Sequence, residues 1–63
     1  MFTMPQEALV KCAATIFQTL RQRTEAAGEP FDVRIGRMVT ETMLVEQVGL
    51  PADAVAMAVA DLA

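Results

Sequence analysis

The chain has 63 residues, a formal net charge of −3, one cysteine and no histidine. A single cysteine excludes an intrachain disulfide, and the lack of histidine excludes an ordinary zinc site. The cross-links that usually stabilise small domains are therefore missing. A chain of this length also buries only ~60% of the surface that its unfolded state exposes. We therefore expect one domain spanning residues 1–63 that is stabilised by association, most simply as a homodimer.

Hydrophobic residues make up 54% of the chain, which predicts a folded protein rather than a disordered one. The longest apolar runs are far shorter than the ~18 residues that a membrane span needs, and Gln6 and Glu7 interrupt any signal-like start. One unpaired cysteine is typical of a reducing compartment. We therefore expect a cytoplasmic protein that does not associate with a membrane.

The first predicted element is a helix over residues ~4–27. Residues 3–6 match a capping box, in which the Thr3 hydroxyl would accept from the backbone, and Gly28 and Pro30 mark the end of the helix. Cys12 lies on the apolar side with no imidazole to activate it, so we expect a structural core cysteine. The predicted apolar face comprises Leu9, Ala13, Ile16 and Leu20, with Cys12 and Phe17 flanking it.

Two interpretations fit the segment that follows. The alternation of apolar residues over 31–35 suits a short strand. Alternatively, Asp32 caps a helix over residues ~33–48 that ends at Gly49, and we favour this helix. Its predicted packed face comprises Ile35, Met38, Val39, Thr42, Val45 and Val48.

The last predicted element is a helix over residues ~51–62. Pro51 suits a helix start, and the alanines that alternate through this segment are good helix formers and poor strand residues. Val55, Val59 and Leu62 form its bulkier face. Three helices with short connections predict an all-α fold, a small three-helix bundle.

The residue types present argue against catalysis. Histidine, serine, tyrosine, tryptophan and asparagine are all missing, which removes the base of a catalytic triad and the commonest general acids and bases. Three scattered glycines form neither a phosphate-binding loop nor a calcium loop. We therefore expect a protein that is not an enzyme, with no catalytic residue, no cofactor and no metal.

A surplus of apolar surface is the main positive indication of function. The middle helix is apolar nearly all round, with Met43 and Leu44 lying off its predicted packed face, so a three-helix monomer should leave apolar area exposed. We predict a non-catalytic interaction or regulatory factor that self-associates and occludes the surface of an unidentified partner protein with an apolar, acidic helical face. The predicted partner-binding residues are Met38, Met43, Leu44, Asp53, Met57 and Asp61.

A DNA-binding regulator is the alternative. The apolar and glycine positions of residues 44–62 resemble a helix-turn-helix unit, and a strand at residues 31–35 would suit a ribbon-helix-helix dimer. However, the last helix offers no side chain that reads base edges, and residues 38–63 carry carboxylates and no basic residue. Nucleic acid is therefore not the expected partner, and the contacts in this alternative would come from Arg21, Arg23, Arg34 and Arg37.

Overall fold

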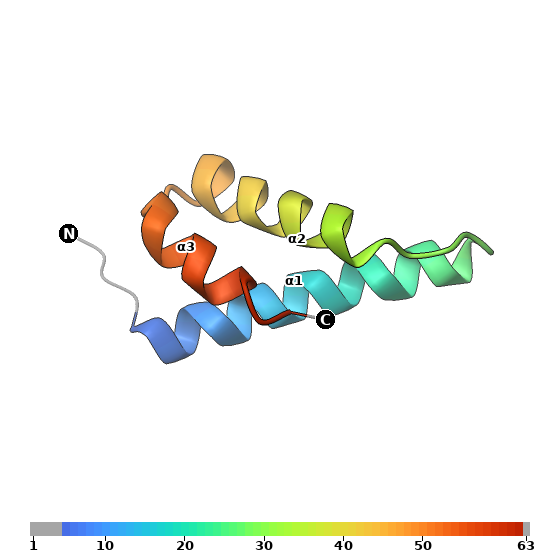
Figure 1. Cartoon of the computed structure of the whole chain (residues 1–63), viewed down its shortest axis with the longest axis horizontal. Helices are drawn as coiled ribbons and strands as arrows, with labels where there is room; N and C mark the ends of the chain where they lie inside the picture. The colour runs from blue at the N-terminus through green and yellow to red at the C-terminus, as the bar shows by residue number, and fades with distance from the viewer. Residues whose placement is uncertain (1–4, 63) are drawn as a thin grey trace.

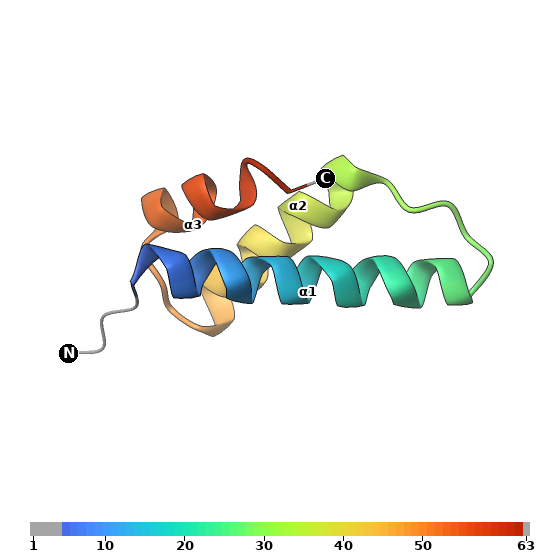
Figure 2. The same cartoon turned by 90° about the horizontal axis from the view of Figure 1, so that it is seen from below.

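The protein is a bundle of three helices, seen in a computed structural model that describes residues 5–62 (Figures 1 and 2). Helix α1 spans Gln6–Ala26, α2 spans Val33–Thr42 and continues as the π-helical segment η1 (Met43–Gln47), and α3 spans Ala52–Val59. In both views α3 lies beside the first half of α1, and α2 crosses α1 obliquely. The predicted all-α architecture is confirmed, and over residues 5–62 no strand forms.

Helix α1 begins directly after Pro5. The predicted cap, Thr3, lies outside the described residues. The helix ends as predicted at Gly28, which has a φ of 78° that favours glycine. The Gly28 amide donates to the Glu25 carbonyl at 3.0 Å, and the Glu29 amide donates to the Thr24 carbonyl at 3.1 Å. These two bonds are those of a Schellman motif, which satisfies the last carbonyl groups of the helix.

Helix α2 begins where Asp32 caps it. The Asp32 carboxylate accepts from the Arg34 amide at 2.9 Å and from the Ile35 amide at 3.4 Å. These bonds satisfy donors that the first turn of a helix leaves unpaired. The helical interpretation of residues 31–35 is therefore correct, and the strand alternative is wrong.

The second helix finishes in a wider, π-helical turn. The Val48 amide donates to the Met43 carbonyl at 3.3 Å, which is the five-residue spacing of a π-turn. Gly49, with a φ of 83°, then ends the helix as predicted, and the Leu50 amide donates to the Leu44 carbonyl at 3.1 Å. Leu50 is buried, so the short connection to α3 is attached to the core.

Helix α3 is shorter than predicted because it ends at Val59. A turn follows, in which the Leu62 amide donates to the Val59 carbonyl at 3.1 Å. The Leu62 side chain packs against the core, as the predicted face with Val55 and Val59 requires, although Leu62 lies beyond the end of the helix. Val55 and Val59 are buried, as predicted.

The core lies where all three helices meet. α1 contributes residues at a spacing of four, with Phe17 continuing the line beyond the main cluster. The prediction that Phe17 flanks the packed face is therefore wrong. The prediction that Cys12 is buried is also wrong, because Cys12 lies outside this line of buried residues and is exposed. The main cluster comprises Leu9, Ala13, Leu44, Leu50, Val55, Ala58 and Val59.

The packed face of α2 differs from the predicted one. Its buried residues are Gly36 and Thr40, and the same four-residue spacing leads to Leu44 in η1. A Cβ atom at Gly36 would lie 3.0 Å from the Phe17 ring, so only glycine lets α2 approach α1 this closely. The buried Thr40 hydroxyl donates to the Gly36 carbonyl at 2.8 Å, so it is satisfied within the helix. The small residues therefore face inward. Of the bulky apolar residues on the predicted face, Val45 packs against the core and the others face outward.

Candidate functional site

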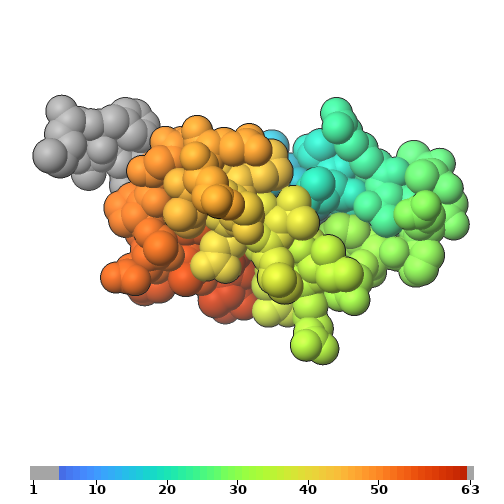
Figure 3. All heavy atoms as spheres, turned by 90° about the horizontal axis from the view of Figure 1, so that it is seen from above, coloured from blue at the N-terminus to red at the C-terminus, as the bar shows by residue number. Residues whose placement is uncertain are grey.

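Among the described residues, the outer side of α2 is an exposed apolar surface, and Met43 at its end is partly buried. We call Ile35, Met38, Val39, Thr42 and Met43 the α2 outer face. Ile35 is 59% exposed and Met38 is 66% exposed. Together with their neighbours they line a shallow hollow of about 270 Å³. Figure 3 shows α2 and η1 running across the front of the molecule with their side chains uncovered.

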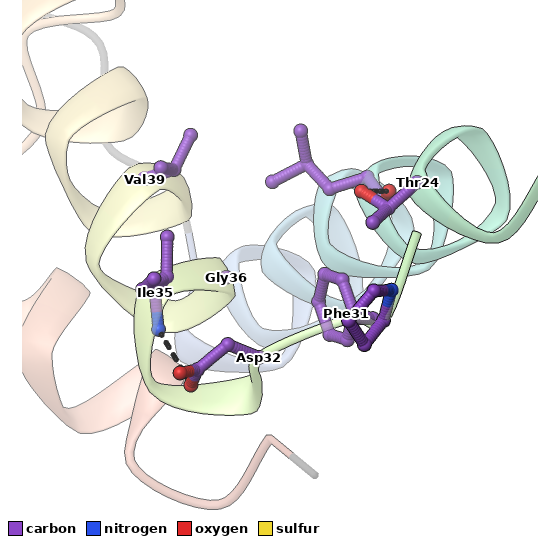
Figure 4. Close-up of a pocket in the computed structure, with 8 residues that line it drawn as sticks. Thr24, Phe31, Asp32, Ile35, Gly36 and Val39 are labelled. Atoms are coloured by element: carbon purple, nitrogen blue, oxygen red, sulfur yellow. Dashed lines mark hydrogen bonds between the residues drawn. The ribbon is translucent and has the colours of Figure 1, made fainter. Parts of the chain in front are cut away.

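A second hollow extends this surface toward α1. It has a volume of about 190 Å³ and shares Ile35 and Val39 with the α2 outer face. In Figure 4, Ile35 and Val39 stand on the α2 side of the hollow, and Thr24 stands across from them on α1. The other lining residues are Leu20, Pro30, Phe31, Asp32 and Gly36.

The polar groups of this hollow are already engaged. The Thr24 hydroxyl donates to the Leu20 carbonyl at 2.8 Å, and the Asp32 carboxylate caps α2. The lining surface that a bound group would contact is therefore mainly hydrocarbon. Such a surface suits an apolar side chain of another polypeptide rather than a polar small molecule.

A third hollow of about 390 Å³ lies between α1 and η1. Leu44 contributes to it, but only 2% of Leu44 is exposed, so the prediction that Leu44 lies off the packed face is wrong. The exposed residues around this hollow include Val48, which is 58% exposed, and Cys12. Leu44 is a core residue because η1 continues the inward line of Gly36 and Thr40.

Helix α3 presents a different surface, which is acidic. We call Asp53, Met57 and Asp61 the α3 acidic face. The three residues follow one another at a spacing of four, and all are exposed, with Met57 70% exposed. In sequence, Met57 is therefore placed between a carboxylate on α3 and another in the turn that follows α3, and residues 38–63 contain no basic residue.

The four arginines considered for nucleic-acid binding lie on two helices and differ in their surroundings. The Arg21 guanidinium lies over the Phe17 ring at 5.9 Å and over the Phe31 ring at 5.3 Å, so Arg21 serves the packing between α1 and the following loop. Arg23 lies in the last turn of α1, while Arg34 is exposed in the first turn of α2. Arg37 is half-buried on α2.

The geometry does not favour DNA binding. Without a strand at residues 31–35, a ribbon-helix-helix dimer has no ribbon. The exposed residues of α3, the candidate recognition helix, are alanines, Asp53 and Met57, none of which reads a base edge through paired hydrogen bonds.

Comparison with known proteins assigns no function. No protein family matches the chain, and no curated protein or solved structure is significantly similar to it. Within residues 5–62, no three His, Cys, Asp or Glu side chains gather where they could hold a metal ion. None of the described helices has both the length and the apolar character to cross a bilayer. The two named faces are therefore the features on which a function can be argued.

Proposed function

We propose that this chain is a non-catalytic, cytoplasmic interaction factor that self-associates and covers a working surface of a second protein. The observation that carries the proposal is the set of bulky apolar side chains on α2, at the end of η1 and on α3 that the fold leaves exposed. Of the large hydrophobic residues that are exposed among residues 5–62, all but Val10 lie in the second half of the chain. They are Ile35, Met38, Val39, Val48 and Met57.

Contiguous apolar patches larger than roughly a few hundred Å² are rare on monomeric proteins and usually mark an interaction site. Burying apolar surface contributes roughly 25 cal/mol of favourable free energy for each Å² removed from water. A monomer that leaves this surface exposed does not gain that free energy. Met38 and Met57 add an advantage for binding, because unbranched thioether side chains repack easily against an irregular partner surface. Association is the arrangement that makes use of these side chains.

The α3 acidic face indicates the chemistry of the second protein. Asp53 and Asp61 are exposed on either side of Met57, so a matching surface has an apolar pocket flanked by basic side chains. Association would place carboxylates opposite cations, which speeds encounter and disfavours acidic competitors. The mechanism is occlusion, in which a short rigid helix covers the partner's surface without changing it chemically.

The test is quantitative capture of partners from the native host with a tagged chain. Met57→Glu places a charge at the centre of the α3 acidic face, and Ala56→Glu adds the same charge at an exposed neighbouring position. We expect a protein that is retained by the wild type and by Ala56→Glu, and lost with Met57→Glu. Equal retention by all three chains would show that α3 does not contact the partner. Leu44 is unsuitable for such a test because it is a core residue.

A further inference from the structure

We infer that the α2 outer face packs against the same face of a second copy, with the two α2 helices antiparallel about a two-fold axis near Met38 and Val39. This inference rests on the self-association in the proposed function and identifies the surface that carries it. Its basis is the combination of exposed apolar residues with a charge pattern that complements itself.

The charges of α2 and η1 are divided along the helix. Arg34 and Arg37 lie in its first half, and Glu41 and Glu46 lie toward its end. In an antiparallel pair, the basic half of each copy meets the acidic half of the other, whereas a parallel pair places like charges together. The helix dipoles also oppose one another only in the antiparallel arrangement, so both electrostatic contributions favour it.

The register follows from the apolar residues. An axis between Met38 and Val39 places these two residues across from each other, and places Ile35 opposite Thr42 of the second copy. Arg34 of one copy then lies opposite Met43 of the other copy, which is two residues from Glu41 and three residues from Glu46. At 1.5 Å per residue, the offsets along the helix are about 3 to 4.5 Å, which an arginine side chain spans.

The α3 acidic face cannot serve as this self-complementary seam. Its charged groups are the carboxylates of Asp53 and Asp61, so a two-fold pairing of that face would bring carboxylate against carboxylate. Like charges placed together across an interface disfavour association. Along α2 and η1 the exposed charges are those of Arg34 and Glu46, which have opposite signs, so this side suits a second copy and α3 is left for a different protein.

The chain exposes enough surface in total for an interface of ordinary size. A stable interface buries about 800 Å² per partner. That is less than a fifth of the 4562 Å² that the chain exposes. A single short helix face falls short of this area, so the interface extends into the adjoining hollow, where Leu20 and Phe31 continue the apolar surface.

Sedimentation velocity of the full chain at micromolar concentration tests the inference. We expect the wild type to sediment at twice its 6.8 kDa mass. Met38→Glu should weaken dimerisation at least ~30-fold, because the carboxylate would be buried at the axis, while leaving the helical circular dichroism unchanged. Gln18→Glu, which adds the same charge at an exposed position on α1, should remain dimeric. A wild-type monomer, or a Met38→Glu chain that dimerises like the wild type, would overturn the inference.

Charge exchange tests the antiparallel order. Arg34→Glu should weaken the dimer by about tenfold, and adding Glu41→Arg and Glu46→Arg to the same chain should restore it. In a parallel pair, Arg34→Glu would only exchange one like-charge contact for another, so undiminished dimerisation contradicts the antiparallel order. These readouts are independent of partner capture by the α3 acidic face. Failure of self-association and failure of occlusion are therefore distinguished by different variants.

Discussion

The Phe31 ring meets the Phe17 ring edge to face, with centroids 5.2 Å apart and planes at 84°. Phe17 comes from the middle of α1, and Phe31 comes from the loop that leads into α2. Arg21 lies over both rings and completes the contact. Edge-to-face pairs and cation–π contacts stabilise beyond the area they bury, so this group fixes the start of α2 against α1.

Phe17→Ala should cause the larger loss of stability at this contact. Phe17 is 1% exposed, and removing a buried phenyl ring costs about 3 to 5 kcal/mol, a large share of the total for a small domain. Phe31→Ala should cost about half as much, because Phe31 is only partly buried. Urea unfolding followed by circular dichroism, at one fixed protein concentration, measures both. An equal or larger loss for Phe31→Ala would contradict this ranking.

Gly36→Ala should destabilise the protein by about 1 to 2 kcal/mol, although alanine is the better helix former by ~1 kcal/mol. The added methyl group would collide with the Phe31 ring and lie 3.0 Å from the Phe17 ring. The loss should shrink by at least about 1 kcal/mol in a Phe31→Ala background, where one of the two rings is gone. A double-mutant cycle from urea unfolding measures this coupling, and purely additive losses would contradict it.

Asp32→Ala should cost about 1 kcal/mol because it removes the cap of α2. Asp32→Asn keeps an oxygen acceptor for the Arg34 and Ile35 amides and should retain most of the stability. Unfolding free energies of the two variants give the comparison. If both variants lose the same amount, the carboxylate acts through its charge rather than as a cap.

Cys12 should react with a thiol reagent in the folded protein within about tenfold of its rate in urea, because its side chain is exposed. A buried thiol would react only when the protein opens. Cys12→Ser should change the unfolding free energy by no more than about 0.5 kcal/mol. Strong protection of the thiol in the folded state would mean that the α1 surface around Cys12 is covered.

The helices and their ends could be predicted because local chemistry determines them. The Asp32 cap and the positive φ values at Gly28 and Gly49 depend on neighbouring residues alone. The end of α3 could not be predicted in this way, because neither a glycine nor a proline follows Val59, where the helix ends.

The orientation of α2 was predicted wrongly because it is decided by packing between helices. The apolar pattern places Ile35 and Val39 inside, yet the rings of Phe17 and Phe31 occupy the space beside α2 and admit only Gly36 at the closest point. The four-residue spacing of Gly36, Thr40 and Leu44 was the signal that could have indicated the true packed face. Ile35 and Val39 were consequently missed as candidate binding residues.

The candidate site could be predicted in part. Met38 and Met57 are exposed, as a partner-binding role requires, and so are Asp53 and Asp61. Leu44 is not exposed, because the face to which it belongs was misassigned. Periodicity identifies a surplus of apolar side chains, but only the packed neighbours decide which of them are left outside.

Leu50 anchors the joint between η1 and α3, since its side chain is buried and its amide is bonded to Leu44. This contact holds the start of the third helix against the end of the second. In a two-fold pair, the paired α2 helices would therefore set the separation between the Met57 side chains of the two copies. A target that displays two matching pockets at that separation would bind both copies at once. The affinity of such bivalent binding can exceed that of a single site by about 10² to 10⁴.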